Sequence, residues 1–281
     1  FIINLKNTFY IFANIKFLYM LSRNQLKYYS SLQQKKYRYI HKSFLAEGDK
    51  IVRELLKDPG DFLKIKTLLA LPEFLEECKM NRGIDKVEVN QKELDRISSL
   101  SSPNKAILEI EIPQYPWSAF ELKDDFSFFL ENIQDPGNLG TIIRTADWFG
   151  IPNLFLTDES VDLYNPTVIQ STMGSFARVR VHYVKPEDFF HEIRKLPPSY
   201  QSIATALDGE NIFKTQFNPS GVFLFGNESR GLSKVLSEQA DVKIHIPGSE
   251  VNSGAESLNL SIAVGIIGAE IIRRKTIQNE S

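Results

Sequence analysis

Polar side chains occupy the junction between an apolar stretch and a helical pattern, the place where open α/β sheets keep their ligands. Residues 126–130 are apolar and predict a buried parallel strand, and Asp-Pro-Gly at residues 135–137 predicts a turn after it. A helix is expected over residues 139–149, so that Asn138 would stand at its N-cap. Arg144 lies further along this helix among apolar residues. It either extends its charged end from an interface into solvent or takes part in chemistry.

Two later segments repeat this pattern. An apolar strand ends at residues 223–225 and runs into a glycine-flanked turn that carries Glu228. A third strand ends at residues 244–246, and Ser257-Leu258-Asn259 opens a long helix expected to end at residue 275. Because the carboxyl ends of parallel strands meet at one edge of a sheet, these loops predict one ligand pocket built from several strand ends.

The three segments, in this order, resemble the signature motifs of the SpoU/TrmH family of RNA 2'-O-ribose methyltransferases. The motifs are Asn-x-Gly-x-x-x-Arg-x-Ala at residues 138–146, Gly-x-Glu-x-x-Gly-Leu at residues 226–232, and Ile-Pro followed by Ser-Leu-Asn at residues 246–247 and 257–259. The resemblance covers residues 126–274. Two departures, Gly248 in place of the usual Met and a longer loop at residues 249–255, leave the expected reaction class untouched.

The resemblance implies an α/β fold for residues 126–281, a SPOUT domain in which the last segment threads a loop to form a deep trefoil knot. It also implies that S-adenosylmethionine is bound in a bent shape, mainly through backbone groups, by Leu207, Gly226, Ile246 and Leu258. Apolar walls and a few amide partners suit an adenine ring, and Gly226 would permit its close approach. Glycines in these loops would serve equally as turn residues, which is the interpretation favoured for Gly231.

The resemblance also assigns catalytic roles. A ribose hydroxyl is a poor nucleophile until its proton is drawn away, and Arg144 corresponds to the arginine that the family places at this task. Because arginine stays protonated in proteins, we expect it to clamp the adjacent phosphate and polarise the hydroxyl. Asn138 would orient Arg144 or the ribose, Glu228 would hold loop amides or Arg144, and Ser257 with Asn259 would fix the last loop against the target. The alternatives are structural: Asn138 as a helix cap and Glu228 as an organiser of its loop.

The composition excludes some kinds of function but does not identify one. A chain of 281 residues with 42% hydrophobic residues has room for two modest domains. Its one cysteine excludes a disulfide framework and a cysteine-based zinc site, and its four histidines lack the spacing of metal ligands, so no metal is expected. A net charge of -2 argues against a protein that coats nucleic acid indiscriminately.

Residues 21–112 predict a smaller α/β domain before the methyltransferase motifs. Its expected elements, in chain order, are strand 43–46, helix 49–56, strand 64–70, helix 72–80, strand 86–89, helix 91–98 and strand 105–111. The run 44–48 resembles the ribosomal-protein-like substrate-recognition domain that rRNA-directed members of the family carry. Residues 1–20 are interpreted as an upstream extension that runs up to a start at Met20, and residues 113–125 as a linker.

A local excess of positive charge interleaved with tyrosines lies between residues 23 and 53, which suits contact with RNA. Lys35, Lys36 and Arg38 are the residues expected to contact phosphates, although an ordinary solvated helix face would show the same pattern. The prediction is a cytoplasmic rRNA methyltransferase, with no membrane segment, that forms a homodimer through the knotted domain. The alternatives are a tRNA 2'-O-methyltransferase and a catalytically silent RNA-binding factor in ribosome assembly.

Overall fold

The computed structural model describes residues 21–78, 83–102, 105–249 and 257–279. The chain divides into two compact units, Phe1–Gln114 and Tyr115–Ser281, and each is described by itself. The expected upstream extension at residues 1–20 lies outside the described residues.

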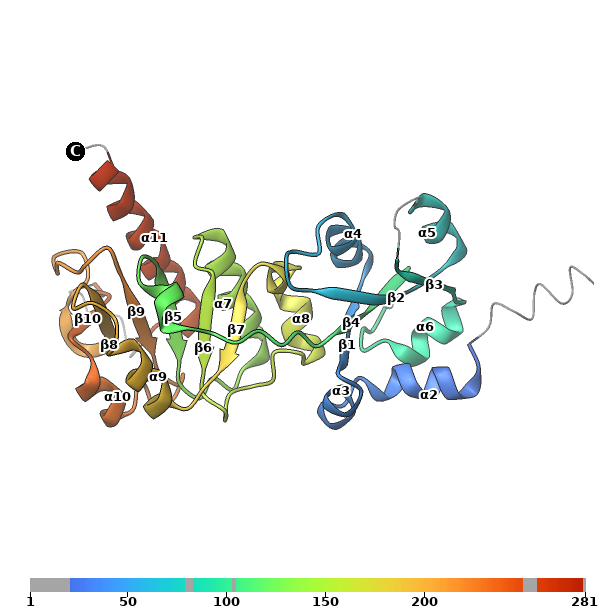
Figure 1. Ribbon diagram of the computed structural model, residues 1–281, viewed down its shortest axis with the longest axis horizontal. Helices are drawn as coiled ribbons and strands as arrows, with labels where there is room; N and C mark the ends of the chain where they lie inside the picture. Colours follow the sequence, from blue (N-terminus) through green and yellow to red (C-terminus); the bar gives the residue numbers. More distant parts are fainter. Residues whose placement is uncertain (1–20, 79–82, 103–104, 250–256, 280–281) are drawn as a thin grey trace, which may run out of the picture. The chain divides into compact units, whose positions relative to one another are not determined.

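The first unit is built on a four-stranded sheet with the order β1-β4-β2-β3 (Figure 1). Strand β4 pairs antiparallel with both β1 and β2, and β3 pairs parallel with β2. The bounds are β1 (Ser43–Glu47), β2 (Lys64–Ala70), β3 (Asp85–Glu88) and β4 (Ala106–Glu111). All four strands lie close to their expected positions, and β1, β2 and β4 each contain a short apolar run.

Five helices of the first unit lie in the described part of the chain: α2 (Arg23–Ser31), α3 (Lys35–His41), α4 (Asp49–Lys57), α5 (Pro72–Glu77) and α6 (Gln91–Ile97). Capping boxes at Ser22 and Asn90 start α2 and α6. The sequence analysis did not predict α2 and α3. Tyr29 of α2 and Leu32, which follows it, are buried with Leu94 of α6 in the core of this unit.

The second unit is built on a six-stranded sheet with the order β10-β8-β9-β5-β6-β7, and every pairing in it is parallel. The bounds are β5 (Phe126–Leu130), β6 (Asn153–Leu156), β7 (Arg180–Tyr183), β8 (Tyr200–Asn211), β9 (Ser220–Phe225) and β10 (Val242–His245). The side chains of the central strands β5 and β9 are buried along their whole lengths. That burial explains their continuous apolar sequences, since the sheet is covered on both faces.

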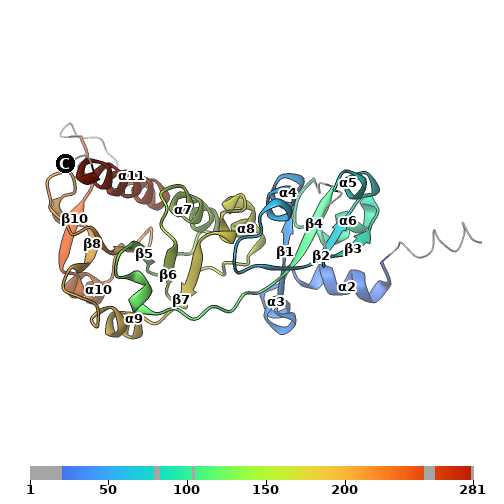
Figure 2. The same ribbon diagram turned by 45° about the horizontal axis from the view of Figure 1, so that its top comes forward.

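Helices α7 (Pro136–Trp148), α8 (Pro166–Thr172) and α11 (Leu260–Asn279) cover one face of this sheet, and α9 (Pro186–Ile193) and α10 (Lys234–Gln239) cover the other (Figure 2). Two short 3-10 turns, η1 (Ala119–Leu122) and η2 (Ser175–Ala177), complete the described unit. The observed α/β class and the parallel sheet agree with expectation. The expected threading of the last segment runs partly through residues 250–256, which lie outside the described residues.

Glycines set how closely three helices of the second unit approach one another. A Cβ atom at Gly140 of α7 would collide with Ser171 and Val168 of α8, and one at Gly268 of α11 would collide with the ring of Phe149. Gly268 therefore permits the close approach of α11 to the end of α7. At Gly265 a Cβ atom would meet no described atom within 4 Å outside the backbone of its own helix.

Most of the segment expected to be a linker packs on the second unit. The Tyr115 hydroxyl donates to the Val181 carbonyl and accepts from the Val181 amide, at 3.3 and 3.1 Å. The ring of Trp117 contacts Phe155 edge-on at 5.0 Å, and Leu122 is buried. Apolar and aromatic side chains in this segment thus fasten it to the edge of the sheet. Among the described helices, none is long and apolar enough to cross a membrane.

Candidate active site

The loops that carry the first and second motifs leave the sheet side by side. Strands β5 and β9 are adjacent and parallel, with Leu130 opposite Phe225 at their carboxyl ends. The Glu131 amide then donates to the Phe225 carbonyl at 2.8 Å, and the Glu131 carboxylate accepts from the Ser233 amide at 2.6 Å. The pairing of the two strands therefore continues into the loops and fixes their spacing.

The helix after β5 begins earlier than the sequence analysis predicted. Asp135 is the N-cap of α7, and its carboxylate accepts from the Asn138 amide at 2.6 Å. Pro136 takes the first helical position, where its missing N–H costs nothing. The prediction of Asn138 as the N-cap is wrong. An Asp-Pro pair is itself an N-terminal signal and would have located the cap.

This shift leaves the carboxamide of Asn138 available to bridge the other two motifs. Its Nδ2 donates to Glu228 Oε1 at 3.3 Å, and its Oδ1 accepts from Asn259 Nδ2 at 3.1 Å. Asn138 is half-buried, whereas Glu228 and Asn259 are exposed. One side chain from each motif thus meets at the carboxyl edge of the sheet, open to solvent.

Asn259 has a second function at the start of α11. Its Oδ1 accepts from the Ser261 amide at 2.9 Å and from the Ser261 hydroxyl at 2.6 Å, so the same carboxamide caps the helix and binds Asn138. Ser257 is exposed and forms no hydrogen bond to any other described residue. The structure therefore includes Asn259, but not Ser257, in the contact between motifs.

Arg144 stands apart from that contact. It lies on α7 six residues beyond Asn138, which places it about 120° away around the helix. Its side chain is exposed, and within the described chain it forms no hydrogen bond or ion pair. The expected contacts of Arg144 with Asn138 and Glu228 are absent between these described residues, and its guanidinium faces solvent.

Three of the residues expected to bind the cofactor lie on or directly after the neighbouring strands β8, β9 and β10, and Leu258 lies just before α11. Leu207 of β8 is 82% exposed and Leu258 is 50% exposed, which is unusual for leucine side chains beside a well-packed sheet. Gly226 follows β9 and Ile246 follows β10. Exposed apolar side chains next to loop backbone are the surface that an adenine ring requires.

The two glycines of the second motif serve the loop itself. A Cβ atom at Gly226 would collide with the backbone of Gly231 and Leu232, so the loop folds back over this residue. Gly231 has φ +68°, a conformation that favours glycine, and its interpretation as a turn residue is confirmed. The close approach at Gly226 is made by its own loop in this structure.

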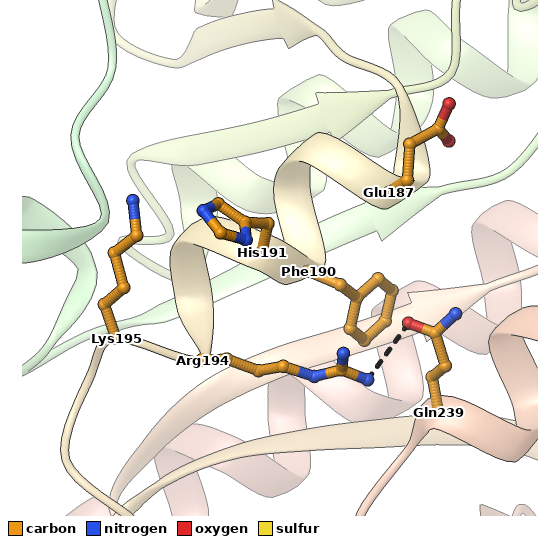
Figure 3. A pocket seen from close by; sticks show the side chains of 6 residues that line it. All are labelled: Glu187, Phe190, His191, Arg194, Lys195 and Gln239. Atoms are coloured by element: carbon orange, nitrogen blue, oxygen red, sulfur yellow. Dashed lines mark hydrogen bonds between the residues drawn. The ribbon is translucent and has the colours of Figure 1, made fainter.

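A cavity of about 460 Å³ lies elsewhere, between α9 and the end of α10 (Figure 3). Its lining consists of Glu187, Phe190, His191, Arg194, Lys195 and Gln239, with Arg194 donating to Gln239 across it at 3.4 Å. None of the predicted site residues lines this cavity. Among the described residues, no cluster of histidine, cysteine and carboxylate side chains could hold a metal ion.

Comparison with known proteins decides the family. The sequence model of the SpoU rRNA methylase family matches residues 125–269, and that of an MRM3-like substrate binding domain matches residues 23–107. The chain belongs to the SpoU rRNA methylase family. The resemblance inferred from the three motifs is thereby confirmed.

Solved structures share this fold over nearly the whole chain. A TrmH-family protein from Porphyromonas gingivalis superposes with a TM-score of 0.80 at 32% identity, over 91% of this chain and 99% of that one. An AdoMet-bound rRNA methyltransferase from Sinorhizobium meliloti superposes with a TM-score of 0.77 at 31% identity, over 91% of this chain and 97% of its own. These structures confirm the expected SPOUT fold class.

A curated relative spans a similar length. The 23S rRNA (guanosine(2553)-2'-O)-methyltransferase RlmP of Bacillus subtilis is 27% identical, over 88% of this chain and 95% of its own. A match of this length includes the SpoU methylase domain and the substrate-binding domain together.

Within the substrate-binding domain of this SpoU family member, the three residues expected to contact RNA separate into two kinds. Lys35 and Lys36 are exposed on α3. Arg38 is only 3% exposed, and its Nη1 donates to the carbonyls of Leu32 and Gln33 just beyond α2. Arg38 closes the end of a helix, where a cation complements the helix dipole, and is not available to phosphates. The prediction for Arg38 is therefore corrected.

Proposed function

We propose that this protein transfers a methyl group from S-adenosylmethionine to a ribose 2'-hydroxyl of large-subunit ribosomal RNA. The observation that carries the proposal is the Asn138 bridge, because it joins the three family motifs at the edge where α/β sheets bind ligands. Two relatives support it: the Bacillus subtilis protein bears the name of a 23S rRNA 2'-O-methyltransferase, and the Sinorhizobium meliloti structure contains AdoMet.

The loops beside these strands suit S-adenosylmethionine, which carries its methyl group on a sulfonium. Attack of the ribose oxygen on that methyl would break the carbon–sulfur bond and release S-adenosylhomocysteine. Leu207 and Leu258 expose apolar surface for the adenine ring. The loop backbone around Gly226 and Ile246 offers amide and carbonyl groups for its polar edge. These four residues are the proposed cofactor-binding set.

The proposed catalytic groups act on the ribose and its neighbouring phosphate. Arg144, exposed and uncommitted within the described chain, clamps the phosphate and polarises the 2'-hydroxyl, while the proton leaves to water or another acceptor. Asn138 is held by Glu228 and Asn259 and presents a fixed carboxamide to the ribose. Ser257 orders the last loop against the RNA.

Two further proposals concern assembly and substrate. Trp148 of α7 is 83% exposed and Ile262 of α11 is 54% exposed, so these packed helices offer apolar surface for a homodimer of the knotted domain. Sedimentation equilibrium of the wild type tests this, and a monomer would contradict it. Residues 21–112, with Lys35 and Lys36, are proposed to bind the RNA in the cytoplasm.

The deciding experiment is a methylation assay followed by mapping. Purified protein is incubated with methyl-labelled S-adenosylmethionine and total RNA from cells that lack the gene, and 2'-O-methylated positions are then located. Label at a ribose of large-subunit rRNA is expected, and the same site should already be methylated in RNA from wild-type cells. Label confined to tRNA would move the target to tRNA. RNA binding without label would identify a silent assembly factor.

A further inference from the structure

We infer that Asn227 is a positioning residue for the methyl transfer. Its side chain attaches the loop that carries Glu228 to the segment that follows β5, and this attachment places the Glu228 carboxylate against Asn138. The inference rests on the proposed function and goes beyond it, because Asn227 belongs to none of the residues to which that function assigns a role. The evidence lies in the hydrogen bonds on both sides of this one side chain.

The carboxamide of Asn227 is used at both ends. Its Nδ2 donates to the Asn132 carbonyl at 2.8 Å, which ties the second motif to the first. Its Oδ1 accepts from the amides of Ser229 and Arg230 at 2.9 and 3.2 Å, which shapes the turn. The Asn227 backbone closes the same turn through two hydrogen bonds with Gly231, at 3.1 and 2.9 Å. The turn is therefore a closed unit, and the Asn227 side chain attaches it to the exit of β5.

The backbone around Asn132, whose carbonyl accepts this hydrogen bond, is itself held by further hydrogen bonds. Asn132 has φ +54°, a left-handed conformation that asparagine tolerates better than most residues. Its amide donates to Thr157 Oγ1 at 2.9 Å, and the next amide, of Ile133, donates to Ser160 Oγ at 3.2 Å. The loop after β6 thus fixes the backbone that follows β5, and Asn227 donates its hydrogen bond to a carbonyl in that fixed segment.

The Glu228 side chain is held less firmly than the residue before it. It is exposed, and among described residues its carboxylate has one hydrogen bond, the 3.3 Å contact with Asn138. Burial therefore does not set its position, and the preceding residue does. A displacement of about 1 Å in a positioning group can cost a reaction roughly 100-fold.

The test is Asn227→Asp, which keeps the shape and the acceptor of the turn. It replaces the donor by a second acceptor that faces the Asn132 carbonyl. The expected result is a fall in kcat of roughly 10-fold to 100-fold, with the KM for S-adenosylmethionine changed less than about 3-fold. Asn218→Asp makes the same charge change just before the start of β9, at the end of this strand away from the loop. It should keep wild-type kinetics. Asn227→Ala serves as a second variant that adds no charge.

A double-mutant cycle shows whether Asn227 acts through Glu228. If it does, Asn227→Asp lowers the residual rate of Glu228→Ala by less than about 2-fold. The inference would be overturned if the losses of kcat in the two single variants multiply in the double variant. It would also be overturned by a wild-type kcat in both Asn227 variants, or by a loss of kcat that only follows a lower melting temperature.

Hydrogen exchange separates this inference from the proposed function. Exchange at residues 226–232 should quicken in the Asn227 variants and stay unchanged in Asn218→Asp, whether or not any RNA is methylated. A wild-type protein that methylates no RNA refutes the proposed function alone. Unchanged exchange in this loop refutes the positioning role of Asn227 alone.

Discussion

Asn138 shows how one hydrogen bond redirects a residue. Asp135 takes the capping position, and the Asn138 carboxamide is then directed to Glu228 and Asn259 instead of to its own helix. A carboxamide can donate and accept at once, so it can join a carboxylate to another amide, which an aspartate or a leucine at this position could not do. The bridge therefore depends on this residue type.

A substitution of Arg144 tests its proposed catalytic role directly. Arg144→Ala should lower kcat roughly 100-fold or more, because a cation that acts on developing charge is lost. Affinity for S-adenosylmethionine, measured by calorimetry, should stay near that of the wild type. Arg144→Lys should recover little, since an ammonium lacks the planar fork of guanidinium. A wild-type rate in the alanine variant would return Arg144 to the alternative of an interfacial side chain that reaches solvent.

His182 predicts a pH dependence of stability. It is 6% exposed, stacks on Phe155 at 5.0 Å and contacts Asn153 through Nε2 at 3.3 Å. Burial, with the nearby charge of Arg180, lowers the pKa of His182 from 6.5 to about 4. The unfolded chain therefore binds the proton first as pH falls. The contribution of His182 to stability is complete above pH 6.5 and is lost towards pH 4.

The loss should reach on the order of 3 kcal/mol of unfolding free energy by about pH 4. His182→Phe keeps the ring contacts and removes the proton site, so its free energy of unfolding should vary less between pH 6.5 and 4. The exposed His191 supplies the control, His191→Phe, which should retain the wild-type slope. Parallel curves for wild type and His182→Phe in denaturant titrations would contradict the prediction.

At the scale of elements, the site depends on where two helices begin. Helix α7 starts beside β5, and α11 starts beside Asn138 through its cap Asn259. The two helices approach closely where Gly268 meets Phe149. Because this contact fixes α11 along α7, it also fixes the depth at which Asn259 reaches Asn138.

Two glycines of α11 provide a matched pair of variants. Gly268→Ala should destabilise the second unit by about 1–3 kcal/mol, because its Cβ atom has no room beside Phe149. Gly265→Ala should stabilise it by up to about 1 kcal/mol, since alanine favours the helix and no described atom lies within 4 Å. Urea denaturation of both variants gives the comparison. Equal effects of the two changes would show that helix propensity, not packing, governs α11.

At the scale of the whole molecule, a slightly negative chain must still attract a polyanion. The net charge is -2, so attraction to RNA has to come from a local patch. Lys35 and Lys36 are exposed, whereas the third expected member of the patch, Arg38, is buried. The proposed RNA contacts of the first unit therefore depend on the two lysines.

The variant Lys35→Gln with Lys36→Gln should bind rRNA more weakly and with a flatter dependence on salt, because fewer counterions are released. The slope of log affinity against log salt should fall by about 1–2. Exposed Lys57 and Lys92 of the same unit, changed to Gln together, are the control for net charge. Cofactor affinity should not change in either variant. An unchanged slope in the first pair would identify an ordinary solvated helix face.

The family resemblance, the order of the motifs, β5 and the strands of the first unit could be predicted from the amino-acid pattern, whereas β6, β7 and β8 of the second unit were not predicted. Residues 126–130 form β5 as predicted, because a short apolar run between polar neighbours has the length of a buried strand and is too short for a typical helix. Strands β1, β2 and β4 of the first unit also contain apolar runs, whereas the short β3 does not. Gly231 was expected to serve as a turn residue, and its φ of +68° agrees with that expectation.

The pairing of polar groups at the site depends on the tertiary fold. Asn138 and Asn259 are 121 residues apart in the chain, and no local pattern pairs them. Arg38 shows the reverse: it is basic and stands in a basic run, yet the packing of α2 and α3 buries it against backbone carbonyls. Propensity and periodicity act over a few residues, whereas hydrogen-bond partners and burial are set by the contacts that folding brings together. Elements with a strong local pattern could therefore be predicted, and the contacts at the site could not.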